Sequence, residues 1–107
     1  MDTTDEWIFS RTGIRRRHIS HVQTSEMASV AALRALAAAD CPGSEIDLII
    51  MATTSPDSLI PNIASTVQAA VGAQCGAFDL NAACSGFLYG VGLASSLVRS
   101  SQHRKVL

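Results

Sequence analysis

The chain has 107 residues, is 48% hydrophobic and carries a formal net charge of −1 at pH 7. This composition is typical of one globular domain and excludes an intrinsically disordered chain. So small a net charge gives no bulk attraction to nucleic acid or to an anionic membrane surface. Polar residues interrupt every apolar run before it reaches about 18 residues, so we expect no transmembrane helix.

The N-terminal residues and the cysteines indicate the cellular compartment of the protein. The opening residues, "MDTTDEW", lack the basic start and the apolar core of a secretory signal peptide. The three cysteines are odd in number and show no C-x-x-C spacing, which argues against a disulfide framework and against a zinc site. We therefore expect a cytoplasmic protein with free thiols and no metal.

The first half of the chain is predicted to contain one helix and one strand. Residues 1–23 are expected to be irregular, with a turn at Gly13. Ser25 is a plausible N-cap for an Ala- and Leu-rich helix that runs to about Ala39. The following "IDLIIMAT", residues 46–53, is a short β-branched run bounded by helix breakers, which predicts a buried strand.

The second half continues the alternation of helix and strand. After a loop, Asn62 is expected to cap a helix that ends before Gly72. "GAFDLNAA", residues 76–83, is predicted to be the next strand, and residues 85–99 a helix so uniformly apolar that we expect a large core around it. "KVL", at residues 105–107, looks like the opening of another strand. This order predicts an α/β fold, with a mostly parallel or mixed sheet covered by helices.

Basic residues cluster near the start of the chain. The cluster consists of Arg11, Arg15, Arg16, Arg17 and His18. Such a cluster is commonly a solvated surface; alternatively, it binds a small anion such as a phosphate group. The charge pattern alone leaves both interpretations open.

Cys84 lies in the sequence "FDLNAACSGFLYG", residues 78–90, where a predicted strand passes into a predicted helix. A cysteine at a helix N-terminus meets unpaired backbone N–H groups and the positive end of the helix dipole, and both favour the thiolate. Its small neighbours leave space for a substrate, and strand–nucleophile–helix turns serve hydrolases in the same way. We therefore consider Cys84 a candidate nucleophile, whereas Cys41 and Cys75 are expected to be ordinary packing residues.

Three motifs together resemble one enzyme family. "TTDEWIFSRTGIRRRHI" (residues 3–19), "ATTSPDSLIPN" (residues 52–62) and "FDLNAACSGFLYG" are similar, in this order and across essentially the whole chain, to the β-ketoacyl-acyl carrier protein synthase III family. The resemblance implies a thiolase-like fold, of which residues 1–107 would form a partial N-terminal domain. It also implies a homodimer and a role in initiating type II fatty-acid synthesis.

The resemblance also implies roles for individual residues. Cys84 would accept an acyl group from acyl-coenzyme A and then react with the carbanion from malonyl-acyl carrier protein, so the partners would be these two substrates, with no cofactor. Trp7 would stack on the adenine of coenzyme A, Arg11 would contact its phosphates, and Thr3 is a weaker candidate for contacting the adenine. Ile60 matches a position that reaches across the dimer and limits the acyl pocket of the partner subunit. Which of Arg15 to Arg17 would contact the carrier protein stays open.

The chain departs from the family in what it lacks. The family uses a histidine and an asparagine far downstream of the cysteine, and His18, His21 and His103 fall in the wrong segments. The sequence therefore resembles a fragment of the enzyme without its C-terminal half, which we expect to be inactive alone. Two alternatives stay open: a relative that makes a secondary metabolite or transfers acyl groups without condensation, and a non-catalytic remnant.

Overall fold

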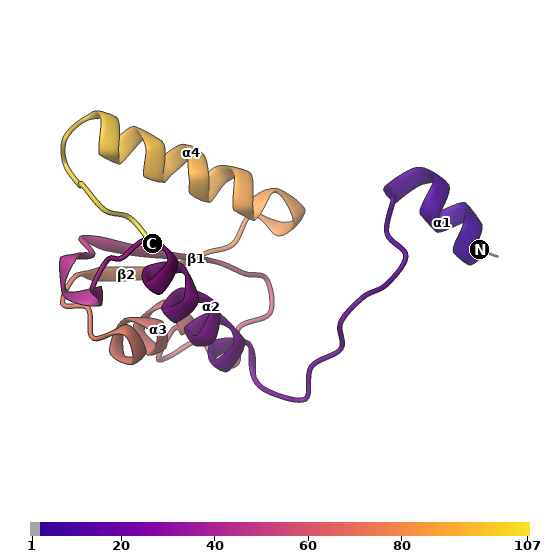
Figure 1. Cartoon of the computed structure of the whole chain (residues 1–107), viewed down its shortest axis with the longest axis horizontal. Helices are drawn as coiled ribbons and strands as arrows, with labels where there is room; N and C mark the ends of the chain where they lie inside the picture. Colours follow the sequence, from indigo (N-terminus) through magenta and orange to yellow (C-terminus); the bar gives the residue numbers. More distant parts are fainter. Residues whose placement is uncertain (1–2) are drawn as a thin grey trace.

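The computed structural model describes residues 3–107; Met1 and Asp2, the first two residues of the acidic start, lie outside the described residues. Figure 1 shows an α/β body in which a small sheet lies between helix α4 on one side and helices α2 and α3 on the other. Helix α1 lies apart from this body, at the end of an extended segment. The α/β architecture predicted from the sequence is confirmed.

The sheet is parallel and has β1 at its centre. Strand β1 (Leu48–Ala52) pairs with β2 (Gly76–Leu80) in a register that runs from Leu48 opposite Gly76 to Ala52 opposite Leu80. On its other side, β1 pairs with the end of the chain: Leu48 forms a parallel bridge with Val106, and the Ile50 N–H donates to the Leu107 carbonyl at 2.8 Å. The predicted strands are confirmed, except that β2 ends at Leu80 rather than at residue 83.

The hydrophobic core lies between the sheet and the helices α2 (Thr24–Ala38) and α3 (Ile63–Val71). Alternate residues of a strand face opposite sides of the sheet, so Ile49 points into this core. The core is made of Ala32, Leu36, Ile46, Ile49, Ile63, Ala64, Val67 and Ala73. Ile63, Ala64 and Val67, at one end and along one side of α3, are between 0% and 3% exposed, so α3 is the most deeply buried helix.

The prediction that residues 1–23 are irregular is wrong for residues 5–12, because α1 spans Asp5–Thr12, and is confirmed for residues 13–23. The Thr4 hydroxyl accepts the Trp7 N–H at 3.1 Å and caps the helix. Asp5 and Glu6 lie in its first turn, where negative charge complements the helix dipole. Gly13 ends the helix with φ 71°, a left-handed conformation that glycine adopts readily, so the turn predicted there is confirmed.

Helix α2 begins differently from the prediction. Ser25 is buried inside the helix rather than at its N-cap, and the N-cap residue Gln23 forms no side-chain capping bond. The capping acceptor comes from elsewhere in the chain, because Asp57 accepts the N–H groups of Thr24 at 2.8 Å and Ser25 at 2.9 Å. Hydrogen bonds from the Ser25 side chain and from the Ser25 and Thr24 N–H groups lower the pKa of Asp57.

The caps of α3 agree with the sequence prediction. The Asn62 side chain accepts the Ser65 N–H at 3.0 Å, and Gly72 ends the helix with φ 71°. The sequence did not indicate a second acceptor: Asp79 of β2 accepts the N–H groups of Ile63 at 3.1 Å and Ala64 at 2.8 Å. Strand β2 is thereby tied to the start of α3.

Helix α4 (Gly86–Arg99) follows a short 3₁₀ turn, Ala83–Ser85. The helix predicted over residues 85–99 is confirmed, and its start differs by one residue. The expectation that a large core surrounds this helix is not met. Gly86 is its one buried residue, while Phe87, Leu88 and Tyr89 are 65–73% exposed. Within the described residues, the sheet covers one side of α4, and the helix is apolar on its other sides as well.

Candidate active site

Cys84 lies on the turn that joins β2 to α4. The strand ends at Leu80, the 3₁₀ turn Ala83–Ser85 places Cys84 at its centre, and α4 begins at Gly86. Ala83 adopts φ 47°, an uncommon left-handed conformation for a residue with a Cβ atom. The Asn81 side chain accepts the Ala83 N–H at 3.2 Å and so supports this conformation. A strained turn of this kind is typical of nucleophile elbows, although here the strain falls on the residue before the cysteine.

The sulfur of Cys84 is accessible. Cys84 is exposed, whereas Cys41 and Cys75 are half-buried. Burial raises the pKa of the Cys75 thiol, which makes its nucleophilic thiolate scarcer at neutral pH. Cys84 is thus distinguished from the other two cysteines by its position and by its exposure.

Backbone N–H groups lie next to Cys84 without a competing side chain. Ser85, the residue before α4, forms no side-chain capping bond. The first N–H groups of a helix have no partner within the helix, and this end carries the positive pole of the dipole. The N–H groups of Ser85 and Gly86 already donate to the carbonyls of Ala82 and Ala83. The positive end of the α4 dipole is therefore the feature that favours a thiolate at Cys84, or the oxyanion that forms when a thiol attacks a thioester.

Trp7 and Arg11 lie together on α1. Their spacing of four residues places them on one side of the helix, and the guanidinium carbon of Arg11 lies 4.0 Å from the centroid of the Trp7 ring. The guanidinium covers one face of the indole ring, and Trp7 is 38% exposed. Thr3 is exposed and directly precedes Thr4, the residue that caps this helix.

A second stacked pair at the end of α1 was not predicted. The guanidinium carbon of Arg15 lies 3.4 Å from the centroid of the Phe9 ring. The two residues are six apart, and the left-handed turn at Gly13 brings them together. Two of the clustered arginines, Arg11 and Arg15, are therefore stacked on aromatic rings, while Arg16 and Arg17 are exposed on the extended segment.

Ile60 lies at the tip of the loop between β1 and α3 and is 91% exposed. The structure thus places the predicted site residues in three regions: the elbow, α1 and this loop. It brings Trp7 and Arg11 into contact, whereas α1 lies apart from the body that carries Cys84 (Figure 1).

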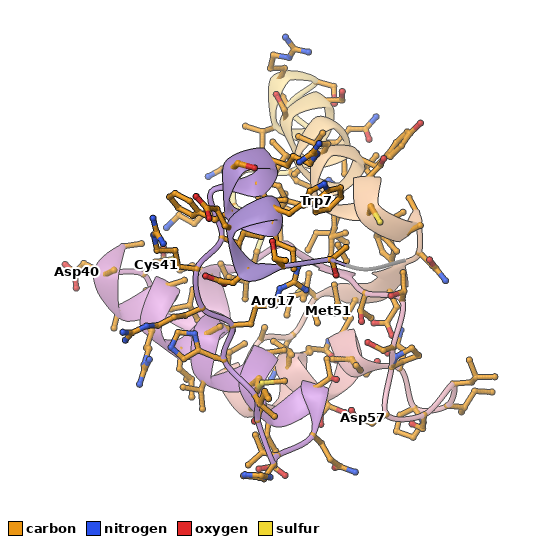
Figure 2. The ribbon with its side chains drawn as sticks, turned by 90° about the vertical axis from the view of Figure 1, so that its right-hand side faces the viewer. Trp7, Arg17, Asp40, Cys41, Met51 and Asp57 are labelled. Atoms are coloured by element: carbon orange, nitrogen blue, oxygen red, sulfur yellow. The ribbon has the colours of Figure 1, made fainter. Side chains whose placement is uncertain are left out.

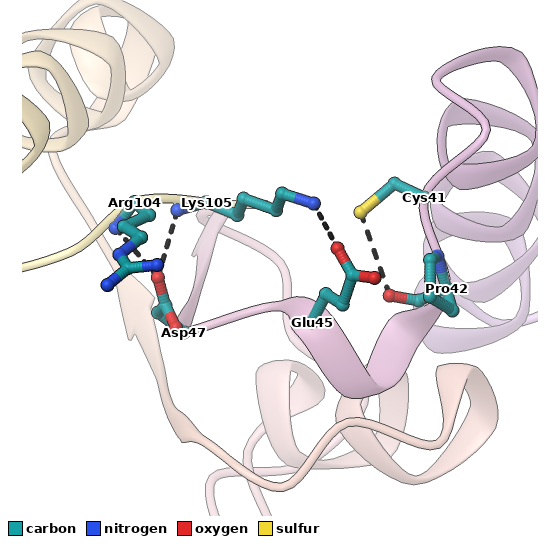
Figure 3. A network of polar contacts seen from close by, with 6 residues as sticks. All are labelled: Cys41, Pro42, Glu45, Asp47, Arg104 and Lys105. Carbon is teal, nitrogen blue, oxygen red and sulfur yellow. Dashed lines mark hydrogen bonds and ion pairs between the residues drawn. The ribbon is translucent and has the colours of Figure 1, made fainter.

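The basic residues after α4 hold the last segment against the body. Figure 3 shows Asp47 accepting the N–H groups of Arg104, at 2.7 Å, and Lys105, at 3.0 Å. These two hydrogen bonds lower the pKa of Asp47, and the bond from the Arg104 N–H has the larger effect. The Lys105 side chain pairs with Glu45, and this hydrogen bond raises the pKa of Lys105. These contacts are structural, because they fix the strand pairing of Val106 beside β1.

Metal sites and membrane-spanning helices are both absent from residues 3–107. Within this range, no cluster of three or more His, Cys, Asp or Glu side chains is placed to hold a metal ion. None of the helices in the same range has the length and apolar character needed to span a membrane.

Comparison with known proteins assigns this arrangement to a family. The family model described as 3-oxoacyl-[acyl-carrier-protein (ACP)] synthase III matches residues 78–107, the part that contains Cys84. β-Ketoacyl-[acyl-carrier-protein] synthase III 2 of Vibrio cholerae is 60% identical to this chain, over all of it and over 30% of its own length. The crystal structure of 3-oxoacyl-[acyl-carrier-protein] synthase III from Aquifex aeolicus superposes with a TM-score of 0.86 and 43% identity, covering 97% of this chain and 34% of that one.

A related condensing enzyme has a similar structure. A tetronic acid condensing enzyme superposes with a TM-score of 0.83 and 28% identity, covering 95% of this chain and 33% of its own. The chain therefore spans about a third of the length of the proteins that it matches. The resemblance drawn from the three motifs is confirmed: along its whole length, this chain is similar to about a third of the β-ketoacyl-[acyl-carrier-protein] synthase III proteins and shares their thiolase-like α/β fold.

Proposed function

We propose that the full-length protein carrying this sequence is a condensing acyltransferase that initiates type II fatty-acid synthesis. It would join an acyl group from acyl-coenzyme A to malonyl-acyl carrier protein and release carbon dioxide and coenzyme A. The observation that carries this proposal is the exposed Cys84 on a strained strand-to-helix turn, directly before the N-terminus of α4. The names of the similar proteins support the same reaction.

In the first step, the Cys84 thiolate attacks the carbonyl carbon of the acyl-coenzyme A thioester. A carbon–sulfur bond forms to Cys84, and the carbonyl oxygen becomes an oxyanion that the positive end of the α4 dipole can stabilise. When the carbonyl reforms, the bond to the coenzyme A sulfur breaks, and coenzyme A leaves as a thiolate that takes up a proton. The acyl group is then held as a thioester on Cys84.

In the second step, malonyl-acyl carrier protein loses its carboxylate as carbon dioxide, and the electron pair of the broken bond remains on the neighbouring carbon. This carbanion attacks the acyl carbonyl on Cys84 and forms the new carbon–carbon bond. The bond to sulfur breaks, so the Cys84 thiolate is regenerated and 3-oxoacyl-acyl carrier protein is released. Both acyl donors are substrates, and the proposed chemistry needs no cofactor or metal.

Three residues are proposed to bind coenzyme A. The exposed indole ring of Trp7 suits the adenine ring, and the Arg11 guanidinium, stacked through its face, keeps its in-plane N–H groups for phosphate oxygens. Thr3, exposed beside the helix cap, is the weaker candidate.

The remaining assignments follow from the family. We propose that the full-length protein acts in the cytoplasm as a homodimer and that its protein partner is acyl carrier protein. In the dimer, Ile60 would limit the acyl pocket of the partner subunit, consistent with its 91% exposure at a loop tip.

Acyl transfer to Cys84 is the first expected outcome. The full-length protein is incubated with acetyl-coenzyme A, digested and mapped by mass spectrometry. We expect the acetyl group on the peptide that contains Cys84 and none on Cys41 or Cys75, because those thiols are half-buried and burial raises the pKa of Cys75. The Cys84→Ala variant is the control and should remain unlabelled. Acetyl on Cys75 with Cys84 untouched would contradict the proposal.

A second candidate function is condensation outside fatty-acid synthesis, favoured by the structural similarity to the tetronic acid condensing enzyme. Both candidates predict an acylated Cys84, so the second substrate distinguishes them. Formation of 3-oxoacyl-acyl carrier protein from malonyl-acyl carrier protein identifies the fatty-acid enzyme. An acylated Cys84 that is not discharged by malonyl-acyl carrier protein favours the second candidate, and no acylation at all indicates a non-catalytic remnant.

A further inference from the structure

The loop between β1 and α3, residues 53–62, ends in an apolar tip. Leu59 and Ile60 at this tip are 85% and 91% exposed. Figure 2 shows the loop that carries Asp57 projecting from the body. A projecting side chain can define the shape of a pocket only if the base of its loop is held in place, so the contacts at the base matter.

The first contact at the base joins the loop to α2. The two carboxylate oxygens of Asp57 accept the N–H groups of Thr24 at 2.8 Å and Ser25 at 2.9 Å. The Thr24 hydroxyl donates back to the Ser55 carbonyl at 3.2 Å. This arrangement combines two charge-assisted hydrogen bonds with a negative charge at the positive end of the α2 dipole.

The second contact at the base joins the loop to α3. Its last residue, Asn62, caps the helix, and Asp79 binds the N–H groups of Ile63 and Ala64. Ile63 and Ala64 are 2% and 0% exposed, so this contact also holds the core together.

Between these two contacts, a hydrogen bond within the loop joins the two sides of its tip. The Ser58 hydroxyl donates to the Pro61 carbonyl at 2.8 Å and bridges the base of the tip. Asp57 directly precedes Ser58 and lies three residues before Ile60. Within residues 3–107, Asp57 is the one side chain of this loop that forms hydrogen bonds to α2.

We infer that Asp57 is a positioning residue for acyl-chain selection: by binding the start of α2, it fixes the direction in which the Leu59–Ile60 tip projects. This inference rests on the proposed function, in which Ile60 bounds an acyl pocket. An asparagine at position 57 keeps the shape of the side chain, but it carries no charge and has one acceptor oxygen in place of two. The tip would then be less constrained, and the pocket would admit longer acyl groups.

The test compares three variants of the full-length protein. Asp57→Asn removes the proposed anchor, and Ile60→Ala removes the tip side chain. Asp47→Asn is the matched control, because Asp47 also accepts two backbone N–H groups but lies before β1, at the end of the strand opposite the loop. The readout is the ratio of kcat/KM for hexanoyl-coenzyme A to that for acetyl-coenzyme A, together with the thermal midpoint of unfolding.

We expect Ile60→Ala to raise this ratio by about tenfold and Asp57→Asn to raise it in the same direction by roughly threefold or more. Asp47→Asn should lower the midpoint of unfolding but leave the ratio unchanged. A ratio that changes with Ile60→Ala but not with Asp57→Asn would overturn the inference and leave the proposed function intact. If neither variant changes the ratio while Cys84 is still acylated, the inference also fails. Absence of acylation at Cys84 in the unaltered protein would instead overturn the proposed function and, with it, this inference.

Discussion

At the scale of single residues, the three cysteines show how position rather than residue type selects a nucleophile. All three are free thiols, but Cys84 is exposed on the elbow, whereas Cys75 is partly buried and its pKa is raised by that burial. A buried thiol forms its thiolate less readily because the charged form loses hydration. The elbow makes the sulfur accessible at the positive end of a helix dipole, and neither of the other cysteines lies at a helix N-terminus of this kind.

Arg11 is expected to contribute directly to the binding of acyl-coenzyme A. The Arg11→Ala change should weaken binding of acyl-coenzyme A by about 1.5–3 kcal/mol, the range for hydrogen bonds to charged groups. The reason is that the change removes both the phosphate ligand and the partner that stacks on Trp7. Binding is measured by isothermal titration calorimetry with the full-length protein.

Two controls separate a ligand role for Arg11 from a structural one. Arg34→Ala, at an exposed position on α2, should leave coenzyme binding unchanged. Acyl transfer from a small thioester without the nucleotide should change little in Arg11→Ala. Equal losses with both donors would show that Arg11 supports α1 rather than binding phosphate.

At the scale of elements, carboxylates connect segments that are distant in sequence. Asp47, Asp57 and Asp79 each accept two backbone N–H groups from another element. Asp47 holds the last segment of the chain beside β1, and Asp57 holds the loop before α3 against α2. Asp79 holds β2 against α3. Each bond satisfies N–H groups that would otherwise lack a partner, so the three residues fix the relative positions of the secondary-structure elements.

The short 3₁₀ helix that contains Gly43 closely approaches the end of α3. Gly43, in the short 3₁₀ helix Gly43–Glu45, lies so near the end of α3 that a Cβ atom would fall 1.8 Å from the Val71 carbonyl oxygen. Gly43→Ala should therefore destabilise the full-length protein by about 1–3 kcal/mol, the usual cost of overpacking. The matched control is Ser44→Ala in the same turn, where the side chain is exposed. Equal thermal midpoints for the two variants would contradict the close contact.

Much of this arrangement could be predicted from the sequence because its signals are local. The β-branched run of β1, the Asn62 cap and the Gly72 stop all act within a few residues, and each prediction is confirmed. The start of α2 could not be predicted in this way, because its capping acceptor, Asp57, lies more than 30 residues away in the sequence. Helix α1 was predictable in principle, because its Thr4 cap, its acidic first turn and its Gly13 stop are all local signals.

The candidate site was predictable in its residues more than in its geometry. The motif around Cys84 indicated the elbow, and the structure places the cysteine there. Residues four apart lie on the same side only in a helix, and the sequence prediction for this segment was irregular. The contact between Trp7 and Arg11 could therefore not be derived from the sequence prediction. The anchoring of the loop by Asp57 depends on contacts between distant segments and left no local signal.

At the scale of the whole molecule, apolar surface is open on α4 and beside it. Phe87, Leu88 and Tyr89 are largely exposed. An apolar groove of about 670 Å³ runs between α2 and α4, with Leu36 and Val91 among its lining residues. Exposed apolar area of this extent is typical of a surface that packs against other protein. The similar proteins are about three times as long as this chain, which is consistent with such packing.

The last prediction follows from this surface: residues 1–107, produced alone, should self-associate and should not catalyse condensation. Self-association is expected because the open side of α4 and the unpaired edge of the strand segment at Val106 favour contact with other copies. Condensation is not expected because no histidine lies at the elbow. His18 and His21 are on the extended segment beside α1, and His103 follows the far end of α4. Sedimentation velocity measures the first property, and an assay with acetyl-coenzyme A and malonyl-acyl carrier protein measures the second, with the full-length protein as the control. A monodisperse and active 107-residue chain would contradict both expectations, and the general base would then have to be sought among these three histidines.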